Sequence, residues 1–209
     1  MRPLPIYRCA WSAAGAVDVD DEAAWSAAPW CALSSWSGAP DPAAAAHGAS
    51  GFQLLADAGA LHLRARLATP EPWLDAARPT THKSHGLWDF DVVELFLSPS
   101  PSGLPYGELE GSPLAQHLDY WIVEPRALVD REWRSGVAVR GAIAGGHSTV
   151  TLTAPWSAFG IAAARGVRAR MNVYAALGPP ARRRYLAWSP TETPEPDFHV
   201  PARFGWLEL

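Results

Sequence analysis

Apolar and polar residues alternate along much of this chain in runs of strand length. In residues 61–67, Leu-His-Leu-Arg-Ala-Arg-Leu, every second side chain is apolar, and residues 149–153 alternate with the opposite parity. A period of two puts one set of side chains on one face, so both runs predict half-buried antiparallel strands. The same reasoning predicts strands over residues 51–56, 61–67, 91–98, 116–124, 137–142, 148–154, 167–175, 185–188 and 204–209.

Turn-forming residues separate these runs. The 20 prolines and 17 glycines favour many turns and few long helices. One helical turn is expected over residues 154–160, where Pro155 opens the turn and Gly160 closes it. We therefore expect residues 1–209 to form a single all-β domain, an antiparallel β-sandwich of the immunoglobulin or jelly-roll kind with minimal helix.

The charge pattern argues against nucleic acid as a partner. The formal net charge is −4, the only lysine is Lys83, and the arginine run 182–184 is expected to be a solvated hairpin tip. No apolar stretch reaches the roughly 18 residues that a membrane span needs, so no membrane partner is expected. Residues 1–11 lack the apolar core of a signal peptide, so we expect a cytoplasmic protein, or an extracytoplasmic one if a leader has been removed.

The residues with metal-binding or redox chemistry are few and scattered. Cys9 and Cys31 are the only cysteines, and without a leader they are expected to stay reduced. His82 and His85 lie in a polar segment and are expected to be solvated rather than to bind a metal. The acidic residues 18–22 offer oxygen ligands for calcium, but without EF-hand spacing we expect a solvated turn there.

The chain is rich in tryptophan, with 11 in 209 residues, and most of these should pack in the core. Trp88 and Trp188 stand out because acidic or polar residues flank each of them. An indole beside a carboxylate suits a sugar, because the C–H face of a pyranose stacks on the ring while its hydroxyls donate to the carboxylate. Trp88 also precedes a predicted strand in a loop, where packing alone poorly explains an exposed indole.

Glu94 lies in a run whose pattern makes a carboxylate unusual. If residues 91–98 form a strand, the residues two positions before and after Glu94 share its face, and both are apolar. A buried carboxylate is costly without a partner. The partner is either a ligand hydroxyl or an arginine such as Arg64 or Arg66.

Six short motifs follow one another along the chain, over residues 17–25, 87–97, 106–113, 155–160, 171–174 and 188–205. Together they resemble carbohydrate-binding module family 9, within the wider DOMON-like superfamily. The resemblance covers nearly the whole chain in the expected order. It implies a non-catalytic β-sandwich that holds a mono- or oligosaccharide between two tryptophans.

The resemblance also implies which residues contact the sugar. Trp88 matches the tryptophan just before the Asp-Val-Val-Glu strand, and Glu94 matches the glutamate that hydrogen-bonds sugar hydroxyls. Trp188 matches the second tryptophan, near the C-terminus. Further candidates for lining the site are Tyr106, Glu108, Asn172 and Tyr174. No cofactor is expected, although some relatives bind calcium.

Departures from the family pattern leave the sugar open, and two other functions stay as alternatives. Glu110 stands where xylanase-borne members offer an arginine to the sugar, and Ala175 and Ala176 stand where many relatives place one. One alternative is a haem-binding DOMON-type cytochrome, for which Met171 is the internal methionine available. The other is a glycoside-processing enzyme. Its carboxylate pair would come from Asp89, Asp91, Glu94, Glu108 and Glu110.

Overall fold

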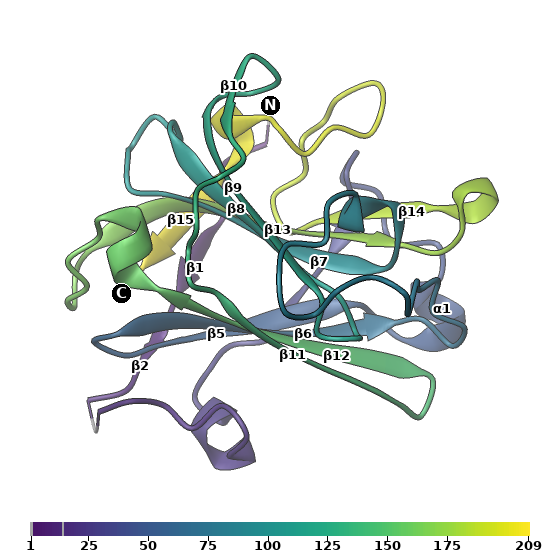
Figure 1. Cartoon of the computed structure of the whole chain (residues 1–209), viewed down its shortest axis with the longest axis horizontal. Helices are drawn as coiled ribbons and strands as arrows, with labels where there is room; N and C mark the ends of the chain where they lie inside the picture. The colour runs from purple at the N-terminus through teal and green to yellow at the C-terminus, as the bar shows by residue number, and fades with distance from the viewer. Residues whose placement is uncertain (1, 14) are drawn as a thin grey trace.

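The computed structural model describes residues 2–13 and 15–209, and it consists mainly of two β-sheets packed face to face (Figure 1). The larger sheet runs in the order β1 (Ile6–Arg8), β15 (Gly205–Glu208), β13 (Arg168–Leu177), β7 (Val92–Ser98), β8 (Tyr106–Gly111), β9 (His117–Glu124) and β10 (Leu128–Asp130), with β14 (Arg184–Ala187) paired to β13 and β4 (Ser34–Ser35) paired to β14.

The smaller sheet runs in the order β11 (Ala138–Ala144), β12 (His147–Pro155), β6 (Ala60–Ala68), β5 (Gly51–Ala56) and β2 (Ala10–Trp11), and β3 (Cys31–Ala32) also pairs with β5. Helical turns are short: α1 (Ala44–His47), η1 (Glu22–Trp25), η2 (Leu87–Asp89), η3 (Trp156–Phe159), η4 (Pro180–Arg182) and η5 (Pro201–Arg203). The predicted β-sandwich with minimal helix is confirmed. No helix among the described residues is long and apolar enough to cross a membrane.

Most strand pairs are antiparallel, as the alternation predicts, but two pairs near the N-terminus are parallel. β1 runs parallel to β15, and β2 runs parallel to β5, so both sheets are mixed. The helical turn predicted around residues 154–160 is η3, which follows Pro155 and ends at Gly160 in the left-handed conformation, with φ of 64°. The sequence pattern missed the central strand β8, because its glycines and glutamates do not alternate with large apolar residues.

Strand β7 shows how the larger sheet separates two environments. Val93, Leu95 and Leu97 face the smaller sheet and belong to the main core. Phe96 faces the other way, into a second apolar cluster that also contains Tyr174. Both faces of this strand are buried, because loops cover the outer face of the larger sheet.

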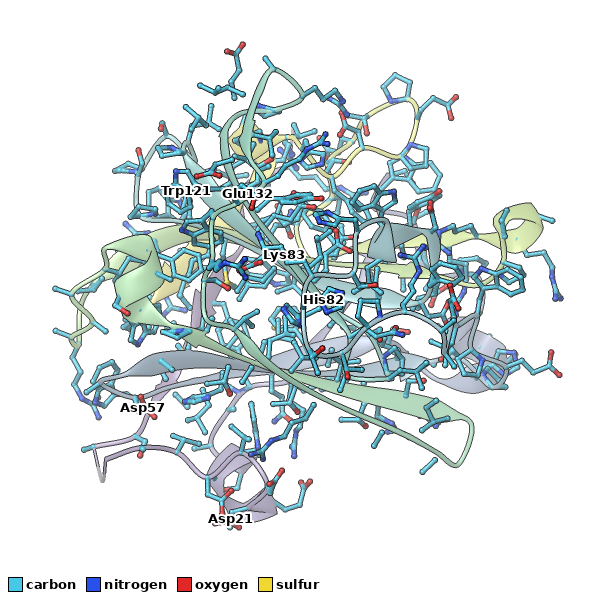
Figure 2. The ribbon with its side chains drawn as sticks, viewed as in Figure 1. Asp21, Asp57, His82, Lys83, Trp121 and Glu132 are labelled. Carbon is cyan, nitrogen blue, oxygen red and sulfur yellow. The ribbon has the colours of Figure 1, made fainter. Side chains whose placement is uncertain are left out.

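The loops over the outer face are held to the sheet by Lys83, the only lysine of the chain, which is labelled in Figure 2. Its Nζ lies 3.0 Å from Oδ1 of Asp119 on β9, and the two side chains are 10% and 5% exposed. It also donates to the backbone carbonyls of Asp119 and Arg131 at 2.7 Å, and to that of Trp133. Residues 69–91, which join β6 to β7, are thereby tied to the sheet.

We expect Lys83→Met to lower the free energy of unfolding by about 3–5 kcal/mol, because it leaves a buried Asp119 without its cation. The matched control is Arg8→Met, which removes an exposed ion pair to Glu208 and should change stability by about 1 kcal/mol or less. Urea denaturation followed by tryptophan fluorescence measures both. Equal effects in the two variants would contradict the anchoring role of Lys83.

Candidate functional site

A cleft of about 710 Å³ opens on the outer face of the larger sheet. This volume lies within the usual range for small-molecule sites. Its floor is formed by β7, β8 and β9, and its walls by residues 69–91, the β9–β10 region and the segment that follows β14. The lining is rich in aromatic and charged side chains: Trp73, Trp88, Asp89, Phe90, Glu94, Glu108, Tyr120, Ile122, Arg126, Val129, Arg131, Ala176, Pro180, Arg183, Tyr185, Pro196, Asp197, Phe198 and His199.

Two half-exposed tryptophans line this cleft. Trp73 is 42% exposed and Trp88 is 44% exposed. Trp73 stacks on Phe90, with ring centroids 6.3 Å apart and an interplanar angle of 12°. Large aromatic faces left open to water at a concave surface are typical of binding sites rather than of packing.

Local structure explains why Trp88 points outward. Helix η2 begins after Gly86, whose φ of 77° lies in the left-handed region that favours glycine. The next residue, Leu87, is fully buried in the outer apolar cluster, so its neighbour Trp88 is turned away from that cluster. A buried anchor followed by an exposed ring is a stable way to present an indole, because the anchor's burial stabilises the turn.

Arg183 holds the same turn from the other side. Its guanidinium donates to the backbone carbonyls of Trp88, of Asp89 at 3.1 Å and of Phe90 at 2.7 Å, and also to that of Gly178 at 2.7 Å. The residues expected to be a solvated hairpin tip therefore have a structural role, and Arg184 likewise pairs with Asp41 at 2.7 Å. The prediction is therefore wrong for Arg183 and Arg184, whose acceptors lie in distant segments of the chain, whereas Arg182 is exposed as expected.

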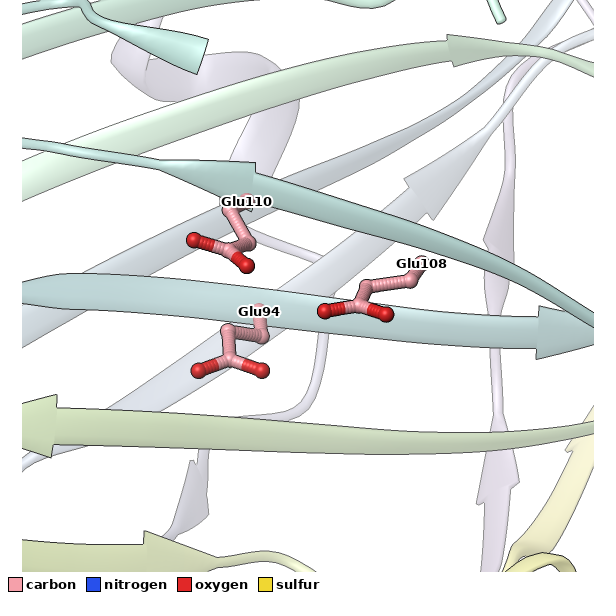
Figure 3. A group of neighbouring side chains, drawn as sticks. All are labelled: Glu94, Glu108 and Glu110. Carbon is pink, nitrogen blue, oxygen red and sulfur yellow. The ribbon is translucent and has the colours of Figure 1, made fainter. Parts of the chain in front are cut away.

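Three glutamates from two adjacent strands meet at the floor of the cleft (Figure 3). Glu94 on β7 pairs directly with Glu110 on β8, and Glu108 is two residues along β8 on the same face. One carboxylate oxygen of each lies within 4.8 Å of the others, and all three side chains are buried. The alternative that Arg64 or Arg66 neutralises Glu94 is wrong, because both arginines lie on β6 of the other sheet.

Burial dominates the ionisation of this group. It raises the pKa of Glu94 well above its usual range, and the neighbouring Glu108 raises it further, while Arg183 lowers it. Burial raises the pKa of Glu108 to about 7. Burial, followed by the charges of Glu94 and Glu108, also raises the pKa of Glu110 well above its usual range. Three buried carboxylates so close together cannot all be charged at neutral pH without compensation.

The structure brings three of the expected site residues to the cleft. Trp88, Glu94 and Glu108 line it. Three others lie on the same side of the sheet but below the surface. Tyr106, Asn172 and Tyr174 are fully buried and support the floor instead of lining it. The expectation that they line the site is corrected by this burial.

Each of these three buried residues has its polar atoms paired within the protein. The hydroxyl of Tyr106 lies 2.7 Å from Nδ1 of His199. The amide of Asn172 donates to the hydroxyl of Tyr174 at 2.7 Å and to the carbonyl of Ser189 at 2.8 Å. These bonds fasten the wall of the cleft to its floor.

Trp188 lies on the opposite face of the larger sheet. Its backbone N–H donates to the carbonyl of Val173 at 2.9 Å, and Val173 faces the main core. Its ring meets those of Tyr7 and Phe52 edge to face, at 6.3 Å and 6.0 Å. The structure therefore contradicts a sandwich of Trp88 and Trp188, because the strand period of two sends Trp188 away from Glu94.

Trp73 is a cleft residue that was not predicted from the sequence, although its position carries a signal. Trp73 follows Pro70, Glu71 and Pro72 in a segment with no strand or helix pattern, so an unexplained loop tryptophan could have been flagged there as it was for Trp88. Arginine reaches the cleft from unexpected positions. Arg126, Arg131 and Arg183 line it, whereas Ala176 lies at the wall and Ala175 in the main core.

The residues considered for metal, haem or redox chemistry make ordinary contacts within the protein. In the acidic turn, Asp21 caps η1, Glu22 pairs with Arg64 at 2.8 Å and Asp20 pairs with Arg140. Nδ1 of His85 lies 2.7 Å from the hydroxyl of Tyr120. Met171 is fully buried in the main core, as expected of a packing residue. Cys9 and Cys31 are partly buried free thiols.

The fold and the cleft define a β-sandwich with an aromatic-lined groove on one sheet. Residues 139–209 match the model of carbohydrate-binding family 9. No curated protein matches the chain. The match covers about the last third of the chain, and the structural likenesses that follow show that the whole chain shares the fold of such modules.

Solved structures share the fold at low sequence identity. A Bacteroides uniformis protein described as a candidate carbohydrate-binding protein superposes with a TM-score of 0.72 and 18% identity, covering 99% of each chain. A family 9 carbohydrate-binding module from Caldicellulosiruptor kristjanssonii in complex with cellotriose gives a TM-score of 0.67 and 13% identity, over 98% of this chain and 93% of that one. The same organism's module in complex with glucose gives 0.69 and 13%, over 98% and 95%.

The different places of the two tryptophans lead to a stability prediction. Trp188→Ala should lower the free energy of unfolding by about 3 kcal/mol or more, because it empties a contact between the sheets. Trp88→Ala should cost about 1 kcal/mol or less, because its ring is already half exposed. Urea denaturation of both variants measures the difference, and a Trp88→Ala loss as large as that of Trp188→Ala would contradict the assignment.

Proposed function

We propose that this protein binds a mono- or oligosaccharide in the cleft on the outer face of the larger sheet, without catalysis. The observation that carries the proposal is the presence of two half-exposed indoles, Trp73 and Trp88, around a floor of carboxyl groups. The family match and the saccharide complexes of structurally similar modules support it.

The chemistry of the lining suits a sugar. The apolar C–H face of a pyranose stacks on Trp88 or Trp73, as flat apolar ligands do on aromatic rings. The carboxyl groups of Glu94 and Glu108 take up the ring hydroxyls, and Arg131 and Asp197 offer a donor and an acceptor at the rim. The aromatic wall and the polar floor together fix the orientation of the sugar and contribute to its affinity.

The placement of the glutamates supports binding rather than hydrolysis. A glycosidase needs two carboxyl groups that flank one bond across a cleft. Glu94 and Glu108 instead sit side by side on one face of one sheet, with Glu110 behind them. We therefore propose that the family 9-like domain acts as a binding module.

We expect Trp88→Ala and Trp73→Ala each to weaken saccharide binding by about 1–3 kcal/mol, which is roughly 5–150-fold in Kd, because each removes a stacking face. Trp30→Ala is the matched control, since Trp30 is 46% exposed but lies outside the cleft lining. Calorimetric titration with glucose and with cellotriose measures the affinities.

The same titrations can refute the proposal. Equal affinities in wild type, Trp88→Ala and Trp73→Ala would place any sugar site elsewhere. Release of reducing sugar from cellotriose over a long incubation would contradict a purely binding role.

A further inference from the structure

The three glutamates at the cleft floor have the geometry of ligands around one ion. They come from neighbouring strands β7 and β8, and their side chains lie next to one another (Figure 3). One oxygen from each lies within 4.8 Å of the others. Oxygen ligands of Ca²⁺ lie about 2.3–2.6 Å from the ion, so two on opposite sides are about 5 Å apart. A single cation can therefore contact Glu94, Glu108 and Glu110 together.

A second observation is that acceptor atoms in this group lack donors. Within residues 2–13 and 15–209, neither carboxylate oxygen of Glu110 has a hydrogen-bond partner, and neither does Oε2 of Glu108. Glu110 is fully buried and points into the group. Buried carboxylate oxygens without a partner are costly, so the group has unused capacity for a positively charged ligand.

The protein's own cations are engaged elsewhere. Among the described residues, none of the three glutamates forms an ion pair. Arg183 donates its hydrogen bonds to backbone carbonyls, and Lys83 pairs with Asp119. The guanidinium of Arg131 lies over the ring of Tyr120. The carboxylate oxygens of the group are thus free to bind a cation from outside the chain.

We propose that Glu94, Glu108 and Glu110 form a binding site for one divalent cation of the class that prefers oxygen ligands, such as Ca²⁺, Mg²⁺ or Mn²⁺. All three ligands are carboxylates, which suit these hard cations and not the soft ones that prefer sulfur. Among the described residues, this is the one group of three such side chains with converging ligand atoms.

The site opens toward the cleft. Glu94 and Glu108 line the cleft, and Glu110 lies behind them. A bound cation would have protein oxygens on the inner side and free coordination positions toward the cleft. If the proposed function holds, on which this step rests, two neighbouring sugar hydroxyls fill those positions, and saccharide binding depends on the cation.

Direct cation binding tests the site without any sugar. Protein dialysed against EDTA, and then freed of it, is titrated with MnCl₂ followed by electron paramagnetic resonance and with CaCl₂ followed by calorimetry. We expect one ion per chain in wild type and at least tenfold weaker binding in Glu110→Gln. Glu124→Gln, at an exposed glutamate of β9, should bind as wild type does.

Two controls keep the result decisive. If Glu110→Gln does not fold, Glu108→Gln replaces it, and a rise in the wild-type melting temperature with CaCl₂ is the second readout. Wild type that takes up neither ion at about 10 mM, which saturates even weak calcium sites, overturns the proposal. Equal binding by wild type and the folded glutamine variant overturns it as well.

Titration with glucose separates this proposal from the function it builds on. Glucose binding that is lost in EDTA and restored by CaCl₂ supports the cation's part. Glucose binding that EDTA leaves unchanged overturns that part and leaves the proposed function standing. Glucose binding in neither condition counts against the proposed function, while the MnCl₂ titration still decides the cation site.

Discussion

The requirement that both faces of the larger sheet be covered governs the architecture of this protein. Its strands β7 and β13 carry large apolar residues on the inner face, to which β8 adds Leu109, and the outer face holds a mixture of aromatic and acidic residues. The smaller sheet covers the inner face. Over the outer face the described residues form no further sheet, so residues 69–91 and the segment after β14 cover it, and the cleft is the part of that face that they leave open.

Loops over a sheet have no regular hydrogen-bond ladder, so long polar side chains hold them. Lys83 ties residues 69–91 to β9 and to the backbone of residues 131–133. Arg183 and Arg170 gather backbone carbonyls of other covering segments. Each of these cations satisfies acceptors that would otherwise be buried without donors. The rigidity of the cleft thus depends on a few buried cations as much as on its aromatic packing.

The acidic floor sets the character of the cleft. Glu94 and Glu110 face each other across a strand pair, a position where like charges destabilise a sheet. Keeping them there costs stability, and Glu108 adds to the cost. Such an arrangement is typical of functional sites, which often keep residues that lower the stability of the fold. The proposed sugar and the proposed divalent cation would both bind to these same carboxyl groups.

The sequence alone determined the fold class and part of the site. The period-two alternation in residues 61–67 and 149–153 predicts sheets with distinct faces, because side chains of a strand point alternately up and down. The same rule put Glu94 on an unusual face, and the loop position of Trp88 marked it as exposed. These properties depend on neighbouring residues in the chain, so they can be predicted from the sequence.

Only the tertiary structure decided which side chains meet. Trp188 has a polar neighbour as Trp88 does, yet pairing with Val173 turns it into the core between the sheets. The convergence of Glu94 with Glu110 depends on the register of β7 and β8. The strand register and the position of the loops over the sheet arise from contacts between distant parts of the chain. A single sequence does not show these contacts, and the cleft results from them.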